Sequence, residues 1–302
     1  MSEEMMKRGV LVRGYGGFYV AADDAGTEYT LRCKKKFRRM HMSPLVGDEL
    51  LFTPGEGEEH GWLEEILPRR SECLRPPVAN VSLLLVVICP SPEPDLLLVD
   101  RLLVRARLQG MKVAIVVNKC DLDASLAEEI RRQYAGADCP VLGVSAREER
   151  GLEALRALLQ GESCCCLTGQ SGVGKSTLLN ALLGLKLETG DISEKIQRGK
   201  NTTRHAQMLI RKCPEGDIRV LDTAGFSLLE LDAMMEPDKL RACYPEFAEH
   251  EGCCRFTPCM HDREPGCSVT AAVAAGELDA GRVERYRLLL ADVRETWKQR
   301  YC

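Results

Sequence analysis

The sequence predicts a protein of mixed architecture: an α/β domain with a doubly wound, mainly parallel sheet, an all-β OB-like barrel before it, and a small cysteine-rich α domain after it. Three observations support this prediction. Residues 1–72 contain short apolar segments punctuated by Gly and Pro, residues 73–231 alternate apolar runs with helical segments, and residues 232–302 are dense in cysteine. We therefore expect three domains with these boundaries.

The first domain is expected to contain five strands. The segments GVLVRG, GFYVAA, EYTLRCKKK, GDELLFTPG and GWLEEIL all lie within about 70 residues, with no convincing helix between them. Short, closely spaced strands separated by turn residues are typical of small barrels, and an OB-like barrel is one such fold.

A basic run lies inside this barrel, at residues 32–39. Its sequence, RCKKKFRR, has six basic residues in eight with Phe37 among them, which suits phosphate contact combined with base stacking. The alternative is a solvated strand edge, because lysines on an edge strand also prevent aggregation. The run by itself leaves both interpretations open.

The middle domain has the strands of a buried sheet. The apolar segments VSLLLVVIC, KVAIVVN, PVLGVSA and CCCLTG are each followed by a helical segment. Continuous rather than alternating apolar strands are what a parallel sheet covered on both faces requires. Two further strands, AQMLIRK and IRVLDT, are separated by the turn CPEGD and predict a hairpin on the same sheet, while the cysteines at 164–166 are expected to act as small buried hydrophobes.

A phosphate-binding loop is predicted at residues 169–176. The sequence GQSGVGKS fits the pattern G-x-x-x-x-G-K-[ST], follows a predicted strand and opens a helix, so its backbone N–H groups and the helix dipole face the phosphates. Lys175 is expected to bridge the β and γ phosphates in catalysis, and the Ser176 hydroxyl to ligate Mg²⁺. A glycine-rich turn that binds nothing is the alternative. The predicted contacts of this loop are Gly169, Gln170, Ser171, Gly172, Val173, Gly174, Lys175, Ser176 and Thr177.

A base-reading loop, NKCD, follows the strand KVAIVV. Asn118, Lys119 and Asp121 are its candidate residues. A carboxylate can accept two hydrogen bonds from guanine N1–H and N2–H₂, whereas adenine would leave it desolvated and unpaired. Ser145 and Ala146 end the next strand, where the Ala146 N–H is available to donate to guanine O6. Together these segments predict selectivity for GTP.

Two further loops complete the predicted nucleotide site. DTAG follows a strand, so that Asp222 can hold the Mg²⁺ shell and the Gly225 N–H can sense the γ-phosphate. GKNTTR supplies Thr202 and Thr203, either of which is available to close over Mg²⁺, and Thr203 is our candidate for a catalytic role.

The order of these motifs is rearranged. Ordinary GTPases begin with the phosphate loop, but here the base reader precedes it and DTAG comes last. Cutting the ring of elements after DTAG and joining the old ends near residues 159–163 leaves every strand with its neighbours. The sequence therefore predicts a circularly permuted P-loop GTPase domain.

A metal site is predicted in the last domain. Cys254, Cys259, His261 and Cys267 supply three thiolates and one imidazole with the spacing C-x4-C-x-H-x5-C. This is a closed tetrahedral set suited to one structural Zn²⁺, which would help to fold a short, loop-rich segment. Cys253 is an alternative to Cys254, and reduced cysteines without metal are the competing interpretation.

Composition sets limits on partners and compartment. The formal charge of −4 does not mark the whole chain as a polyanion binder, and the longest apolar run, residues 81–89, falls well short of the ~20 residues of a membrane helix. The N-terminal MSEEMMKRGV lacks a targeting pattern, so we expect a cytoplasmic monomer with no membrane partner. Fifteen cysteines in a reducing compartment favour metal binding or burial over disulfides.

These motifs together resemble the ribosome small subunit-dependent GTPase family, also called RsgA or YjeQ, across nearly the full length. The resemblance includes the junction LRPPVANV, NKCD, GQSGVGKST, GKNTTR, DTAGF and CRFTPCMHDREPGCSV. It implies GTP hydrolysis coupled to late assembly of the small ribosomal subunit. It also implies contacts with rRNA through the barrel, including the basic run, and through the zinc domain.

The chain departs from the family pattern in its switch segments. Asn201 stands where the family has a histidine before the paired threonines, and DTAG replaces the usual DTPG. Phe226 occupies the place where many GTPases carry a water-positioning glutamine. Because Asn is not a useful base near pH 7, we expect slow intrinsic turnover that accelerates when the subunit orders the switch.

Two other functions compete with this one. An RNA-binding scaffold that holds GTP as a structural ligand would show negligible turnover. A P-loop ATPase or kinase would require NKCD to be accidental.

Overall fold

The structure is a computed structural model that describes residues 6–40, 42–55, 59–74, 77–185, 206–222 and 235–299. Its internal contacts divide the chain into two compact units. The first contains Met1–Leu84, Ala154–Thr168 and Leu179–Phe226, and the second contains Leu85–Glu153, Gly169–Leu178 and Ser227–Cys302. These units cut across the three predicted domains, whose boundaries remain a prediction.

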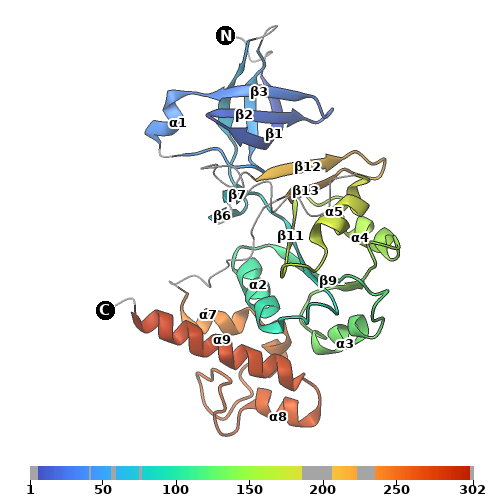
Figure 1. The fold of residues 1–302 in the computed structure, drawn as a ribbon. Helices are drawn as coiled ribbons and strands as arrows, with labels where there is room; N and C mark the ends of the chain where they lie inside the picture. Colours follow the sequence, from blue (N-terminus) through green and yellow to red (C-terminus); the bar gives the residue numbers. More distant parts are fainter. Residues whose placement is uncertain are drawn as a thin grey trace. The chain divides into compact units, whose positions relative to one another are not determined.

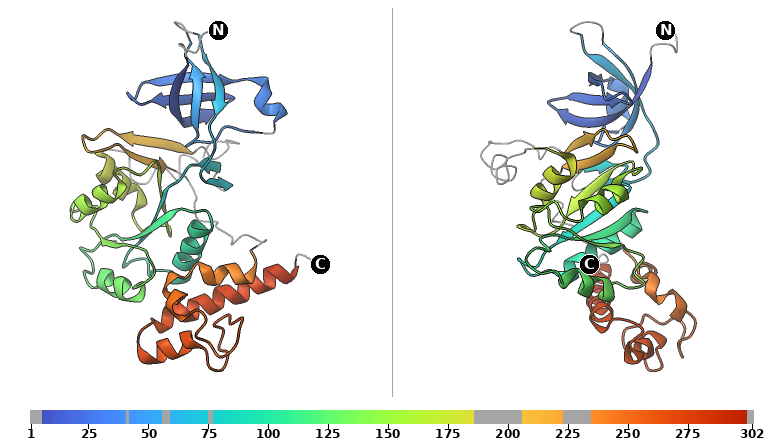
Figure 2. Two further views of the ribbon diagram at one scale, coloured as in Figure 1. Left: turned by 180° about the vertical axis from the view of Figure 1, so that it is seen from behind. Right: turned by 90° about the vertical axis from the view of Figure 1, so that its right-hand side faces the viewer.

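A five-stranded barrel forms one part of the first unit (Figure 1). Its strands pair in the order β1-β2-β3-β5-β4, and β4 pairs back with β1 to close the sheet. Both views of Figure 2 show these strands curving around a common interior. The predicted OB-like barrel is confirmed. The strands are β1 (Lys7–Tyr15), β2 (Phe18–Asp23), β3 (Glu28–Cys33), β4 (Glu49–Thr53) and β5 (Gly61–Ile66).

The barrel core follows from strand alternation, since successive side chains point to opposite faces. Leu31, Leu50, Phe52 and Leu63 are fully buried inside, and Leu11 is 1% exposed. Burying a side chain of this size contributes about 1.5–3 kcal/mol. The inward-facing apolar side chains of the strands thus fill the interior of the closed barrel.

The basic run was expected to continue the third strand, but in the structure it does not. β3 ends at Cys33, and Lys35–Arg39 form the short helix α1. Phe37 explains the difference: it is only 4% exposed and packs in the barrel core, so the chain turns to bring it inward. The Phe37 ring is therefore not placed for the base stacking that the sequence suggested.

The rest of the first unit carries part of the α/β sheet. β11 (Cys165–Thr168) pairs in parallel with β13 (Ile218–Asp222), which forms the predicted antiparallel hairpin with β12 (Gln207–Arg211). β12 also pairs with β1 of the barrel, with Gln207 opposite Arg13. A small additional hairpin, β6 (Glu72–Leu74) with β7 (Pro77–Ala79), was not predicted.

The cysteines before the phosphate loop are buried, as predicted. Cys164, Cys165 and Cys166 are at most 1% exposed and are reduced thiols, not members of disulfides. Burial raises the pKa of Cys164 well above its ordinary value. These side chains act as small hydrophobes and not as nucleophiles.

The second unit contains the other part of the α/β sheet. β9 (Lys112–Val117) lies between β8 (Leu83–Ile88) and β10 (Val141–Gly143), and β9 and β10 are parallel. The apolar runs of β8 and β9 are buried along their length, which the predicted two-sided cover requires. The helices α2 (Leu96–Leu108) and α3 (Leu126–Gln133) belong to this unit, whereas α4 (Leu152–Leu159) belongs mostly to the first unit and the residues of α5 (Lys175–Leu183) are divided between the two.

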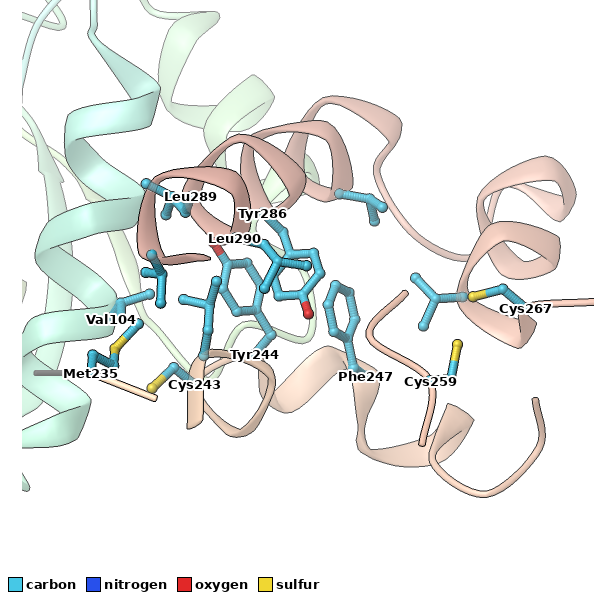
Figure 3. Packing of buried hydrophobic residues seen from close by; sticks show 14 residues of the cluster. Val104, Met235, Cys243, Tyr244, Phe247, Cys259, Cys267, Tyr286, Leu289 and Leu290 are labelled. Carbon is cyan, nitrogen blue, oxygen red and sulfur yellow. The ribbon is translucent and has the colours of Figure 1, made fainter. Parts of the chain in front are cut away.

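The C-terminal part of the second unit packs around aromatic side chains. Figure 3 shows Tyr244, Phe247 and Tyr286 side by side, with ring centroids 4.9–5.2 Å apart. Val104 of α2 and Leu290 belong to the same core. The elements here are α7 (Pro237–Ala242), the 3-10 helix η2 (Pro245–His250), α8 (Ser268–Ala275) and α9 (Ala280–Gln299).

Among the described helices, none combines the length and the apolar character needed to cross a bilayer.

Candidate functional site

The phosphate loop has the backbone that its glycines predict. Gly169, Gly172 and Gly174 all have positive φ, a conformation that other residues rarely adopt. A Cβ on Gly169 would lie 2.1 Å from the Val87 carbonyl oxygen, and one on Gly174 would lie 2.6 Å from the Asn118 amide nitrogen. The loop therefore needs glycine both for its dihedral angles and for its close approach to β8 and to the base-reading loop.

Lys175 opens α5 and folds back over this loop. Its Nζ donates to the Gly169 carbonyl at 2.8 Å and to the Gln170 carbonyl at 2.7 Å. Burial lowers the pKa of this ammonium. Since a partly desolvated cation gains from an anionic partner, the loop offers a phosphate a positive charge in addition to the N–H groups of the helix terminus.

Asn118 joins three loops. Its amide Nδ2 donates to the Val173 carbonyl of the phosphate loop at 2.9 Å, and its Oδ1 accepts from the Ala146 N–H at 3.1 Å. The residue is 2% exposed. One buried side chain thus fixes the phosphate loop and the loop after β10 relative to the loop after β9.

The other base-reading residues also meet within the second unit. Lys119, with φ of 60°, donates from Nζ to the carbonyls of Gly172 at 2.7 Å and Ser91 at 2.8 Å. The Asp121 carboxylate accepts a hydrogen bond of 2.5 Å from the hydroxyl of Ser145. That bond lowers the pKa of Asp121, so the carboxylate is held in its ionised form.

One backbone N–H that was predicted to contact the guanine base already donates a hydrogen bond within the protein. The Ala146 N–H was expected to be available for guanine O6, but it donates to Asn118. A guanine carbonyl at this point would have to share or replace that bond, and the role stays a prediction.

The other predicted residues are placed as follows. Ser171 and Gly172 are exposed at the tip of the phosphate loop, and Ser176 and Thr177 lie in the first turn of α5. Of Asp222 the structure describes the backbone, at the end of β13 in the first unit. Three predicted residues lie outside the described part of the chain, namely Thr202, Thr203 and Gly225.

The loop after β8 also belongs to the site, although no motif in the sequence predicted it. The Gln170 side chain accepts from the Asp95 N–H at 3.0 Å and donates to the Glu93 carbonyl at 3.2 Å. Asp95 also caps α2 through a hydrogen bond from the Leu98 N–H. The position of this segment, CPSPEPD, directly after a buried strand was the available signal, because loops at the carboxyl ends of parallel strands line ligand sites.

A second candidate site lies between η2 and α8. The ligand atoms of Cys254, Cys259, His261 and Cys267 lie within 4.8 Å of one another. Cys259, His261 and Cys267 are at most 5% exposed. The edges of a zinc tetrahedron with sulfur and nitrogen ligands are about 3.5–3.8 Å long, so a small contraction would complete the site.

The surroundings of this cluster fit a metal. His261 Nδ1 faces the sulfurs of Cys267 at 3.4 Å and Cys254 at 3.7 Å. Burial opposes ionisation of Cys254, but hydrogen bonds from the hydroxyl and amide of Ser268 outweigh it and the pKa of the thiol is lowered. Cys253 is exposed and its thiol donates to the Glu249 carbonyl, so within the described residues Cys254 and not its neighbour belongs to the cluster.

The phosphate loop and the base reader form one site although the base reader comes first in the chain, and this defines a P-loop GTPase domain in circularly permuted order. Family models give the same result: one described as RsgA GTPase matches residues 66–232, and one described as RsgA N-terminal domain matches residues 8–63. The chain belongs to the RsgA GTPase family and is a GTPase.

Individual relatives extend this likeness over nearly the whole chain. A protein of Ruminiclostridium cellulolyticum named small ribosomal subunit biogenesis GTPase RsgA is 40% identical over 286 residues, covering 93% of this chain and 92% of its own. A protein of the same name from Moorella thermoacetica is 40% identical, covering 94% and 97%.

Solved structures agree with the fold. YjeQ from Thermotoga maritima is 32% identical with a TM-score of 0.81, covering 95% of this chain and 98% of its own. YloQ, described as a circularly permuted GTPase, is 27% identical with a TM-score of 0.76, covering 98% of each chain.

Proposed function

We propose that this chain hydrolyses GTP to GDP and phosphate and couples the reaction to late maturation of the small ribosomal subunit through binding of rRNA. The observation that carries the proposal is Asn118, which holds the base-reading loop against the phosphate loop through the Val173 carbonyl. The names of the relatives, small ribosomal subunit biogenesis GTPase, support the choice of subunit. In bacteria this assembly takes place in the cytoplasm, where we expect the activity.

Each residue of the site has a proposed role. Asp121, ionised and oriented by Ser145, accepts from guanine N1–H and N2–H₂. Lys175 contacts the β and γ phosphates. Ser176 and Asp222, together with Thr202 or Thr203, would hold Mg²⁺, which would supply positive charge to the phosphate oxygens.

We expect the reaction to be slow in the isolated protein. Asn201 and Phe226 stand where related GTPases carry groups that orient water, and neither side chain is a base near pH 7. Ordering of Thr203 by the subunit would then accelerate hydrolysis, as partners do for other GTPases.

Phosphate release with and without ribosomal subunits tests this coupling. Small subunits are expected to raise the turnover number at least tenfold, and large subunits, as the matched control, to leave it unchanged. Equal rates in all three conditions would instead favour an RNA scaffold that holds GTP as a structural ligand.

Base selection has its own test in Asp121→Asn. An amide offers guanine one acceptor in place of two and a donor suited to the O2 of xanthine, so preference should shift from GTP to xanthosine triphosphate. Competition between the two nucleotides for a fluorescent GDP analogue measures the shift. Asp123→Asn, two residues further along the same loop, is the control and should leave the preference for GTP intact.

We also propose that the Cys254, Cys259, His261 and Cys267 cluster holds one structural Zn²⁺. Three thiolates and one imidazole form a closed tetrahedral set without an open position for catalysis. The metal would stabilise the loops between η2 and α8, which contain little other regular structure.

A further inference from the structure

The segment between β8 and α2 lies along the phosphate loop. The Ser91 carbonyl of this segment and the Gly172 carbonyl of the loop both accept a hydrogen bond from the Lys119 ammonium, at 2.8 Å and 2.7 Å. A Cβ on Gly172 would lie 3.7 Å from Cδ of Pro92, which is an ordinary van der Waals distance. We call residues 91–95 the supporting segment.

Gln170, the second residue of the phosphate loop, is bonded to the supporting segment by both ends of its side-chain amide. Its Oε1 accepts from the Asp95 N–H at 3.0 Å, and its Nε2 donates to the Glu93 carbonyl at 3.2 Å. Only an amide offers a donor and an acceptor on one short planar group, so an ionised carboxylate or an ammonium at this position could form only one of the two bonds. Together the two bonds fix the orientation of the Gln170 side chain.

The supporting segment is itself anchored to a packed helix. The Asp95 carboxylate accepts from the Leu98 N–H at 2.9 Å and so caps α2. Further along this helix Leu102 and Leu103 are at most 1% exposed. Because an element with a buried face moves less than an exposed loop, Gln170 ties the phosphate loop to a fixed point.

The backbone of Gln170 lies beside the lysine that is expected to contact phosphate. Lys175 donates from Nζ to the carbonyls of Gln170 at 2.7 Å and Gly169 at 2.8 Å. The three glycines of the loop, Gly169, Gly172 and Gly174, leave its backbone more conformational freedom than other residues would. Contacts with neighbouring segments therefore have to hold the empty loop in one conformation.

From this geometry we propose that Gln170 is a positioning residue of the phosphate loop. Its side chain, bonded to the backbone of Glu93 and Asp95, holds the empty loop in the conformation that binds the β-phosphate. A loop that is ordered before the nucleotide arrives loses less conformational entropy on binding, which raises the affinity. The inference rests on the proposed contact of this loop with the phosphates, and it gives the Gln170 side chain a role that acts through the loop.

Gln170→Met tests this role in the full-length protein. The methionine side chain has nearly the same length but lacks both amide groups. The affinity for GDP, measured by displacement of a fluorescent GDP analogue, should fall about tenfold, since each hydrogen bond changes an equilibrium constant by roughly 2- to 13-fold. Gln133→Met is the matched control: it removes an exposed amide that is bonded to Glu129 on α3, and the affinity should stay within about twofold of the parental value.

The number of phosphates separates positioning from a general loss of structure. GMP lacks the β-phosphate, which is expected to lie in the loop, so Gln170→Met should weaken GMP binding less than about twofold. The ratio of GDP affinity to GMP affinity should therefore fall about fivefold. An equal loss of affinity for both nucleotides would mean that Gln170 only stabilises the fold of the site, and the proposal would be overturned.

A double-mutant cycle tests the partner of Gln170. Asp95→Pro removes the N–H that donates to Gln170, and the φ of Asp95, −79°, is close to that of proline. The loss of GDP affinity caused by Asp95→Pro should be severalfold larger in the parental protein than in Gln170→Met, where this bond is already absent. Loss of the cap on α2 contributes equally in both. Equal effects in the two proteins would show that Gln170 does not act through the supporting segment and would overturn the proposal.

These measurements need no ribosomal subunits, so the two proposals fail in different ways. Parental GDP affinity in Gln170→Met overturns the positioning role and leaves the coupling to the small subunit intact. Small subunits that did not raise phosphate release by the parental protein would overturn the proposed function, while the loss of GDP affinity in Gln170→Met would still support the positioning role.

Discussion

Asn118 shows how one amide can organise a site made of distant segments. It donates to Val173 and accepts from Ala146 while almost fully buried. The sequence pattern predicts that this residue is part of a base-reading loop. The pattern cannot reveal that its two hydrogen bonds also set the distance between loops, because that depends on the backbone of residues 28 and 55 positions away.

Asn118→Ala should therefore affect stability as well as affinity. It leaves a buried carbonyl and a buried N–H unpaired, which costs about 1–3 kcal/mol for each group. Thermal unfolding without nucleotide should show a lower Tm, and titration with a fluorescent GDP analogue should show weaker binding. Gln133→Ala, which removes an exposed amide bonded to Glu129, is the control and should change neither. If the Tm of Asn118→Ala equalled that of the parental protein, the inference that Asn118 holds these loops together would be wrong.

Ser145 gives a prediction about pH. Its hydroxyl lowers the pKa of Asp121 below 3.8, so in the folded protein the carboxylate stays ionised, and able to bind guanine, until the pH falls through that lowered value. Ser145→Ala raises the pKa of Asp121 toward its ordinary value. GDP binding should then be lost at a higher pH on the acid side, as well as being weaker at neutral pH.

A second Asp–Ser pair in the same loop supplies the control. Asp123 accepts from the Ser125 hydroxyl at 2.7 Å, and this bond also lowers its pKa. Ser125→Ala should leave the acid limb of GDP binding where it is, measured by the same fluorescence titration at a series of pH values. Equal shifts in both variants would mean that the loop as a whole, and not Asp121, controls binding.

At the scale of elements, α2 and α9 are joined by a buried ionic network. Asp100 is fully buried and accepts from Tyr134 at 2.6 Å, Arg282 at 2.5 Å and Arg285 at 2.8 Å. Arg282 also donates to Glu246 at 2.7 Å. Since α2 is capped by Asp95, which contacts the phosphate loop through Gln170, this network connects the C-terminal helices to an element of the nucleotide site.

Asp100→Asn should be strongly destabilising. It removes the charge that compensates the buried Arg282 guanidinium and the partly buried Arg285 guanidinium. Removing one partner of a buried ion pair costs about 3–5 kcal/mol. Urea unfolding measures the loss. Arg101→Gln is the matched control, because Arg101 and Asp292 join the same two helices through an exposed pair, worth about 0–1 kcal/mol. Similar losses in both variants would show that burial does not set the strength of these pairs.

The periodicity of apolar residues predicted most of the helices and strands. It failed where the burial of one side chain determined the course of the backbone. The buried strands β8, β9 and β11 and the β12–β13 hairpin follow from apolar runs and turn residues. The helix at Lys35–Arg39 does not, because a run of lysines and arginines fits a strand equally well until Phe37 is known to point inward. The Asp100–Arg282 pair spans 182 positions and leaves no local pattern at all.

At the scale of the whole molecule, the order of the chain and the order in space are independent. The loops after β9 and β10 precede the phosphate loop in sequence, yet Asn118 and Lys119 bond directly to it. The motifs could be recognised because each keeps its own local sequence. Their convergence required only that the strands keep their neighbours, which a change in the position of the chain ends does not disturb.

The C-terminal part of the molecule should depend on its metal. Cys259 and Cys267 belong both to the cysteine–histidine cluster and to the hydrophobic core that contains Tyr244, Phe247 and Tyr286. Because zinc binding supplies folding free energy to such segments, a strong chelator should lower the Tm of the full-length protein and release one zinc ion per chain. Cys254→Ser should have the same effect on both, whereas Cys253→Ser, which removes the adjacent exposed thiol outside the cluster, should retain the metal and the parental Tm. If the Cys254→Ser protein kept one equivalent of zinc and the parental Tm, Cys254 would not be a zinc ligand. If the parental protein contained no zinc, the cluster would consist of buried thiols and a histidine without a metal.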